Sequence, residues 1–122
     1  MVSINSKSFS SVITNLVNNA IKYGDSKVLI STAINDGKFF IFVEDDGLGV
    51  PLHLQEKIFK PFFRSNNHAT NNISGFGLGL SIARNIVEKH AGKLSVGNST
   101  LGGAKFIVSL SYSNYQLLNL FE

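Results

Sequence analysis

The feature that most constrains the fold is an amphipathic helix, which the apolar pattern predicts from about Phe9 to Tyr23. Apolar side chains recur there at the spacings that place them on one face of a helix: Phe9, Val12, Ile13, Leu16, Val17, Ala20 and Ile21. Such a face has to be covered by other elements. We therefore expect this helix to pack on a core that the rest of the chain supplies.

A second, narrow face of the same helix is polar. Asn15, Asn19 and Lys22 follow at i, i+4 and i+7, and Tyr23 lies beside them near the helix end. Asn is a poor helix former, and exposed helix positions usually carry Glu, Lys or Gln instead. We therefore interpret the two amides as residues of a functional site.

The length of 122 residues suffices for one compact domain and is too short for two. We expect a single domain over 1–122, with a core of about 5–112 and a C-terminal tail over 113–122. Ten Phe and a hydrophobic content of 43% can supply the core. The absence of cysteine excludes disulfides and thiolate metal sites.

No apolar run approaches the roughly 20 residues of a membrane span. The first residues, MVSINSK, also lack the charged and apolar regions of a signal peptide. We expect a soluble domain without membrane contact. The net charge of +3 mildly favours an anionic ligand, and no pattern indicates nucleic-acid binding.

A β-hairpin is predicted after the helix. Lys27–Ala33 and Lys38–Asp45 are rich in β-branched and aromatic residues, and Asn35–Gly37 between them has the composition of a turn. The second strand is apolar from Phe39 to Val43, so we expect it in mid-sheet with both faces buried. A further short strand is expected over Val2–Ile4.

The segment Asp45–Gly49 follows the predicted central strand. Its two glycines, Gly47 and Gly49, permit a tight turn and a close approach of a ligand to the backbone. An ordinary Asp-Gly turn explains these residues equally well. The two adjacent acids, Asp45 and Asp46, favour the site interpretation slightly.

A short helical piece with four expected core anchors is predicted within Leu52–Arg64: Ile58, Phe59, Phe62 and Phe63. The polar stretch Ser65–Ser74 then has the composition of a loop. Gly75–Leu80 is rich in glycine and opens a helix that we expect over about 78–90. Free N–H groups at such a helix start suit a phosphate. We interpret the remaining strands, 93–97 and 104–112, and their connection as structural.

In this order, the segments resemble the catalytic and ATP-binding domain of bacterial sensor histidine kinases. This family belongs to the GHKL superfamily, which also holds chaperone, type II topoisomerase and mismatch-repair ATPases. The resemblance runs from about Asn5 to Tyr112. Four segments match the family's N, G1, F and G2 boxes, in that order: Asn15–Tyr23, Asp45–Gly49, Phe59–Arg64 and Gly75–Leu80.

The resemblance implies an α+β fold of the Bergerat type. This fold is a two-layer sandwich, in which helices pack on one face of a mixed, mostly antiparallel sheet. A flexible ATP lid, here Ser65–Ser74, is expected to close over the site and exclude water.

The resemblance also implies roles for individual residues. Asp45 would accept the adenine amino group, Asn19 would bind Mg²⁺ with Asn15 near enough to assist, and Lys22 and Arg64 would contact the terminal phosphates. Tyr23 would lie against the adenine ring, and packing of this side chain on the core is nearly as good an explanation. The implied nucleotide-binding residues are Asn19, Lys22, Tyr23, Asp45, Gly47, Gly49, Arg64, Gly75, Gly77, Leu78, Gly79 and Leu80.

Asn15 indicates the type of reaction. The ATP-hydrolysing branches of the superfamily carry a glutamate there that activates water, and an amide cannot act as such a base. The γ-phosphoryl group would instead go to a histidine on a separate dimerisation and phosphoacceptor hairpin. None of His53, His68 and His90 has the acid that follows the acceptor histidine in this family, and we expect His90 to be structural.

The chain is therefore interpreted as the excised catalytic domain of a two-component histidine kinase. Its implied partners are the phosphoacceptor hairpin of the parent protein and a response regulator. The domain is expected to be monomeric and cytoplasmic, and its parent can be anchored in the inner or plasma membrane.

Two other functions stay open at this point. One is a serine kinase of the anti-sigma type, which shares the fold and an Asn-rich N box. The other is a module that binds ATP and changes partner contacts without transferring phosphate. An acid-labile product distinguishes histidine from serine phosphorylation, and labelling of a histidine-bearing hairpin would exclude the sensing module.

Overall fold

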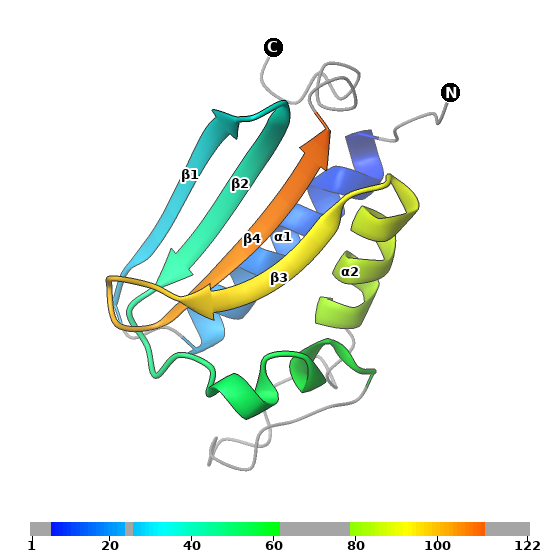
Figure 1. Ribbon diagram of the computed structural model, residues 1–122. Coiled ribbons are helices and arrows are strands. Elements are labelled where there is room, and N and C mark those ends of the chain that lie inside the picture. The colour runs from blue at the N-terminus through cyan, green and yellow to red at the C-terminus, as the bar shows by residue number, and fades with distance from the viewer. Residues whose placement is uncertain (1–5, 24–25, 62–78, 112–122) are drawn as a thin grey trace.

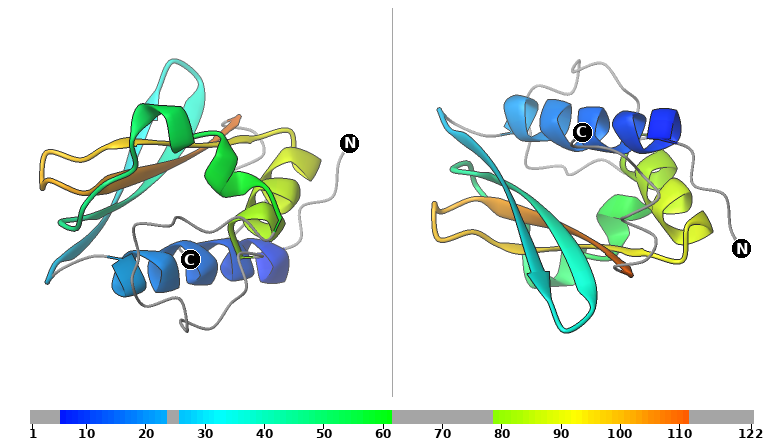
Figure 2. Two further views of the ribbon diagram at one scale, coloured as in Figure 1. Left: turned by 90° about the horizontal axis from the view of Figure 1, so that it is seen from below. Right: turned by 90° about the horizontal axis from the view of Figure 1, so that it is seen from above.

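The computed structural model describes residues 6–23, 26–61 and 79–111, which form two layers (Figure 1). One layer is a sheet in the order β1-β2-β4-β3, and the other consists of two helices on one of its faces (Figure 2). Two short 3₁₀ turns, η1 and η2, follow β2. The bounds are α1 Ser6–Tyr23, β1 Val28–Asn35, β2 Lys38–Asp45, η1 Leu52–Leu54, η2 Lys57–Phe59, α2 Gly79–Lys89, β3 Lys93–Asn98 and β4 Ala104–Ser111. The predicted α+β sandwich is confirmed.

The amphipathic helix begins at Ser6, three residues earlier than the prediction. Its buried face is formed by four fully buried residues spaced by three and four: Phe9, Val12, Leu16 and Ala20. Ile21, which was predicted on the same face, is 64% exposed. It follows Ala20 by one position, about 100° further round the helix, and so falls outside the buried stripe.

All pairings among the described strands are antiparallel, which agrees with a mostly antiparallel sheet. The β1–β2 turn is shorter than predicted, because Asn35 is still paired with Lys38. Asp36 and Gly37 alone form it, with φ of 55° and 76°. Two residues with positive φ match the twist of the flanking strands, so the hairpin register is fixed locally.

β2 lies inside the sheet, between β1 and β4, as predicted. The expectation that both of its faces are buried was wrong. Phe39, Ile41 and Val43 are buried, but Phe40 and Phe42 on the other face are only half-buried. The reason is that α1 and α2 cover one face of the sheet and leave the described part of the other face open.

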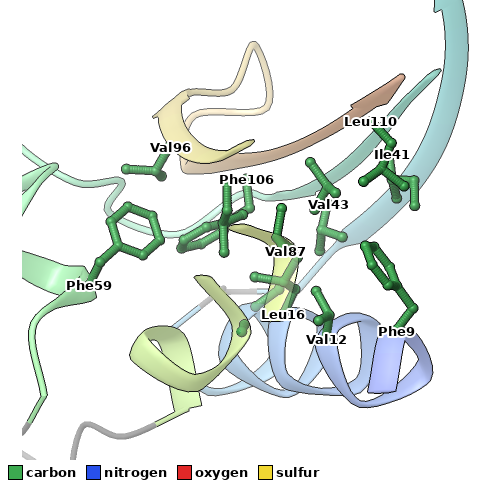
Figure 3. Packing of buried hydrophobic residues seen from close by; sticks show 14 of the residues in the cluster. Phe9, Val12, Leu16, Ile41, Val43, Phe59, Val87, Val96, Phe106 and Leu110 are labelled. Atoms are coloured by element: carbon green, nitrogen blue, oxygen red, sulfur yellow. The ribbon is translucent and has the colours of Figure 1, made fainter. Parts of the chain in front are cut away.

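The core lies between the sheet and the helices. Phe9 and Leu16 of α1 point toward the sheet, and Phe106 of β4 points toward the helices (Figure 3). Phe59 of η2 is buried and meets Phe106 edge to face, with 6.3 Å between the ring centroids. Ile58 packs against the same core, so these two predicted anchors are confirmed, while Phe62 and Phe63 lie outside the described residues.

His90, at the end of α2, is structural as predicted. It is buried, and its ring meets that of Phe9 edge to face at 4.9 Å. Its Nδ1 lies 2.7 Å from the carbonyl oxygen of Ile86, to which it donates a hydrogen bond in the matching tautomer. The hydrogen bond fixes the ring against α2, and the contact with Phe9 ties the end of α2 to α1.

The predicted strand over 2–4, the polar stretch 65–74 and the tail 113–122 lie outside the described residues. Within the described ranges, no helix combines the length and apolarity that a bilayer span requires.

Candidate functional site

The described site residues come from three elements that approach one another at the lower end of the fold in Figure 1. Asn15, Asn19 and Lys22 lie on α1, Asp45 ends β2, and Gly79 begins α2. Gly47 and Gly49 follow β2, and Leu80 follows Gly79. Arg64, Gly75, Gly77, Leu78 and the side chain of Tyr23 lie outside the described residues.

The carboxylate of Asp45 is the most constrained group of the site. Asp45 is only 2% exposed, and its Oδ1 accepts hydrogen bonds from the N–H groups of Gly47 at 2.9 Å and Ala104 at 3.2 Å. No donor among the described residues bonds to Oδ2. One oxygen therefore fixes the orientation of the carboxylate, while the other is left to accept a hydrogen bond from a ligand.

Gly103, in the β3–β4 turn, packs directly against this carboxylate. Its N–H donates to the carbonyl oxygen of Asp45 at 3.1 Å. A β-carbon on Gly103 would overlap Oδ1 of Asp45 and lie 2.5 Å from the nitrogen of Gly47. Sequence reasoning treated this turn as a mere connection, and the doublet Gly102-Gly103 was the signal available for it.

Gly49 also occupies a position that requires glycine. Its φ is 75°, in the left-handed region, and a β-carbon there would lie 3.4 Å from the carbonyl oxygen of Gly103. The loop after β2 and the β3–β4 turn are therefore in close contact. The prediction of a tight, glycine-dependent turn at this strand end is confirmed.

Asp46, the second acid of the motif, has a different environment. Its Oδ1 accepts hydrogen bonds from the N–H groups of Ser26 at 2.9 Å and Lys27 at 3.0 Å, and its Oδ2 accepts one from Ser26 Oγ at 2.8 Å. These bonds tie the end of β2 to the segment before β1. Both oxygens of Asp46 thus accept hydrogen bonds within the described residues, whereas Oδ2 of Asp45 accepts none.

The polar face of α1 lies beside the start of α2. Oδ1 of Asn15 is 3.7 Å from the position of a β-carbon on Gly79, the first residue of α2. Asn15 and Asn19 are half-buried, and Lys22 is exposed. Because the first N–H groups of a helix and its positive dipole end favour anions, this junction suits phosphate groups.

The described residues contain no group of three His, Asp or Glu side chains that could hold a metal ion. Among the described residues of this site, the side-chain amide oxygens of Asn15 and Asn19 are donors that could hold a cation together with oxygens of a ligand. That donor set fits Mg²⁺, which takes few protein ligands and bridges phosphate oxygens.

Arg84 of α2 connects the η2 turn to the helix, a contact that the sequence analysis missed. Its guanidinium lies over the ring of Phe59, 4.5 Å from the centroid, and its Nη1 is 3.0 Å from Oε1 of Glu56. Arg84 and Glu56 are 28 positions apart, so no local spacing indicates the pair.

A family model described as "Histidine kinase-, DNA gyrase B-, and HSP90-like ATPase" matches residues 4–114. The chain belongs to this family. Proteins of known sequence and solved structures that match most of this chain include sensor histidine kinases. The resemblance to sensor histidine kinases is thereby confirmed.

One curated relative is the sensor histidine kinase CpxA of Escherichia coli (strain K12), which is 33% identical over 106 residues. The match covers 87% of this chain and 23% of CpxA, so the chain spans less than a quarter of that relative. Among solved structures, the mycobacterial sensor histidine kinase MprB has a TM-score of 0.79 and 26% identity, covering 88% of this chain and 74% of that one. Full-length ShkA in complex with AMPPNP has a TM-score of 0.73 and 27% identity, covering 84% and 21%.

Proposed function

We propose that this domain binds ATP with Mg²⁺ and transfers the γ-phosphoryl group to a histidine on a separate helical hairpin of its parent kinase. The observation that carries the proposal is the oriented carboxylate of Asp45, with one oxygen held by two backbone N–H groups and the other left for a ligand. The match to ShkA, which was solved with the ATP analogue AMPPNP, supports this ligand class.

Asp45 accounts for a preference for adenine. An ionised carboxylate only accepts hydrogen bonds, and adenine presents an amino group where guanine presents a carbonyl oxygen. Guanine would leave two acceptors facing each other in a buried position. Sites that require a hydrogen bond of this kind reject the wrong ligand by up to about 10⁴-fold.

The phosphate end of the nucleotide would lie at the junction of α1 and α2. Asn19, assisted by Asn15, would bind Mg²⁺, which neutralises phosphate charge when bound. Lys22 and Arg64 would donate to the terminal phosphates. The glycine-rich segment, with Gly75, Gly77, Leu78, Gly79 and Leu80, would supply N–H groups, and Gly47 and Gly49 would let the base approach the backbone.

The acceptor is inferred from Asn15. An amide in that position cannot deprotonate an attacking water, so hydrolysis is slow and a better nucleophile has to come from another domain. Catalysis by this domain consists of holding ATP in line with that nucleophile and stabilising the charge on the transferring group. The phosphoacceptor hairpin and a response regulator are the partners, and the reaction takes place in the cytoplasm.

The decisive experiment is phosphotransfer in trans. The domain is mixed with ATP labelled in the γ-phosphate and with a two-helix hairpin that carries a histidine followed by an acid. We expect label on the hairpin that survives base and is lost in acid. A hairpin with His→Ala is the matched control. Acid-stable label would indicate a serine kinase, and ATP binding without any label would indicate a sensing module.

A further inference from the structure

Two adjacent acids at the end of β2 bind the same β3–β4 turn from opposite faces of the sheet. Asp45, on the helix side, accepts the N–H of Ala104. Glu44, on the other side, accepts a hydrogen bond of 2.8 Å from Ser99 Oγ. Both members of the second pair are buried, at 8% exposure each. The turn is thus held on both sides of β2.

Ser99 is also the residue around which the turn is built. Its Oγ accepts the N–H of Leu101 at 3.0 Å, and its own N–H donates to the carbonyl oxygen of Gly103 at 2.8 Å. At the end of the turn, the N–H of Gly103 donates to the backbone carbonyl oxygen of Asp45 and the N–H of Ala104 donates to its Oδ1. Ser99 therefore helps to set where these two donors lie, whereas the other donor to Oδ1, the N–H of Gly47, follows β2.

We propose that Ser99 and Glu44 are positioning residues for base recognition: by fixing the β3–β4 turn, they aim the free oxygen of Asp45 at the nucleotide base. The proposal rests on the proposed function, in which Asp45 binds adenine. Neither residue touches the nucleotide in this arrangement, because Glu44 lies on the face of β2 opposite to Asp45 and the hydroxyl of Ser99 is bonded to Glu44.

The chemistry of the pair favours positioning over simple stabilisation. Burial of a carboxylate carries a desolvation cost, and an apolar pair of similar size would often stabilise a fold at least as well. A hydrogen bond from a hydroxyl to a carboxylate is, however, directional and short. It holds the β3–β4 turn in one geometry. In that geometry the N–H of Ala104 bonds to Oδ1 of Asp45, and Oδ2 stays available to the base.

The test compares two ligands that differ only in the base amino group: ATP and purine riboside triphosphate. In Ser99→Ala, we expect the affinity for ATP to fall roughly tenfold and that for purine riboside triphosphate to stay unchanged. Ser99→Thr, which keeps the hydroxyl, should restore the ATP preference. Ser95→Ala on the same hairpin is the control, since its hydroxyl has no hydrogen bond among the described residues.

Glu44→Gln covers the case in which Ser99→Ala does not fold. It keeps the shape of the side chain and removes its charge, which weakens the bond to Ser99, so the ATP preference should fall by roughly threefold. An NMR measurement without nucleotide adds a second readout. The amide of Ala104 should exchange faster with solvent in Ser99→Ala than in Ser95→Ala.

Equal losses of affinity for both nucleotides would assign the pair a structural role only and overturn the proposal. An unchanged ATP preference in both Ser99→Ala and Glu44→Gln would overturn it as well. If the unaltered domain binds neither nucleotide, the proposed function itself fails. Failure of the proposed function is distinguishable from failure of the positioning role, because it appears with the unaltered domain, before any variant is made.

Discussion

Asp45 Oδ1 and the backbone N–H of Ala104 form a hydrogen bond of 3.2 Å across 59 positions of the chain. The bond joins the end of β2 to the start of β4, two strands that pair from Lys38 with Ser111 to Glu44 with Lys105. The carboxylate that the site depends on is therefore oriented by the two inner strands of the described sheet, and we expect it to be in place before a ligand binds.

The first prediction concerns the charge of Asp45. Asp45→Asn keeps an oxygen that can accept the N–H groups of Gly47 and Ala104, so the fold should be preserved. Because the amide cannot present two accepting oxygens, we expect ATP affinity to fall at least about 100-fold. Calorimetric titration with ATP measures the loss, and circular dichroism checks the fold. Unchanged affinity would contradict the adenine assignment.

The neighbouring acid supplies the matched control. Asp46→Ala removes the three hydrogen bonds to Ser26 and Lys27, which lie at an exposed position. We expect a loss of about 1 kcal/mol in the free energy of unfolding with ATP affinity nearly unchanged. A large loss of affinity in this variant would mean that the two acids are not functionally distinct.

Much of the fold could be predicted because its signals are local. The stripe from Phe9 to Ala20 has helical spacing, and the Asp36-Gly37 turn sets the register of its own hairpin. The error on β2 has a physical cause. Phe40 and Phe42 complete a continuous apolar run in the sequence, which predicts burial of both faces. In the structure their rings stack on each other with 6.0 Å between centroids, so they are half-buried without a covering helix.

The site was predictable only where its residues form motifs in sequence. Asp45 stands next to its glycines, and Asn15 and Asn19 share a helix face. Gly103 and Ser99 act through contacts with residues more than 50 positions away, so only the folded sheet reveals them. The contacts of Arg84 with Glu56 and Phe59 are likewise absent from any local pattern, because both partners lie at least 25 positions earlier in the chain.

The second prediction tests the proposed metal ligand. In Asn19→Ala, the gain in ATP affinity that Mg²⁺ provides should disappear, because the amide oxygen is the only group removed from the proposed metal site. Affinity for ADP without Mg²⁺ should be unchanged. Titrations with and without Mg²⁺ measure both. Asn18→Ala, an exposed position on the same helix, is the control, and an equal effect there would argue against a specific ligand.

The third prediction tests the packing around two glycines of the β3–β4 hairpin: Gly92, directly before β3, and Gly97, within β3. A β-carbon on Gly92 would lie 2.6 Å from Leu110 Cδ2 and 2.6 Å from the carbonyl oxygen of Ser109, whereas one on Gly97 meets nothing within 4 Å. Gly92→Ala should lower the free energy of unfolding by about 1 to 3 kcal/mol. Gly97→Ala should change it by less than about 0.5 kcal/mol. Urea titration measures both, and equal effects would contradict the packing.

The fourth prediction concerns the exposed apolar side chains of β1, one of the two outer strands of the described sheet. Ile30 and Ile34 are 51% and 57% exposed. An outer strand with an apolar face is a common site of self-association. We expect the domain to be monomeric at micromolar concentration and to associate when it is more concentrated.

Ile34→Lys should raise the concentration at which association begins by about threefold or more, as measured by analytical ultracentrifugation. ATP affinity should be unchanged, because Ile34 pairs with Phe39, at the end of β2 opposite to Asp45. Thr32→Lys adds the same charge at an exposed position of the same strand face without removing an apolar side chain. If Thr32→Lys raises the threshold concentration for association as much as Ile34→Lys does, net charge and not the apolar face controls association. If neither variant changes the threshold, the contact lies elsewhere.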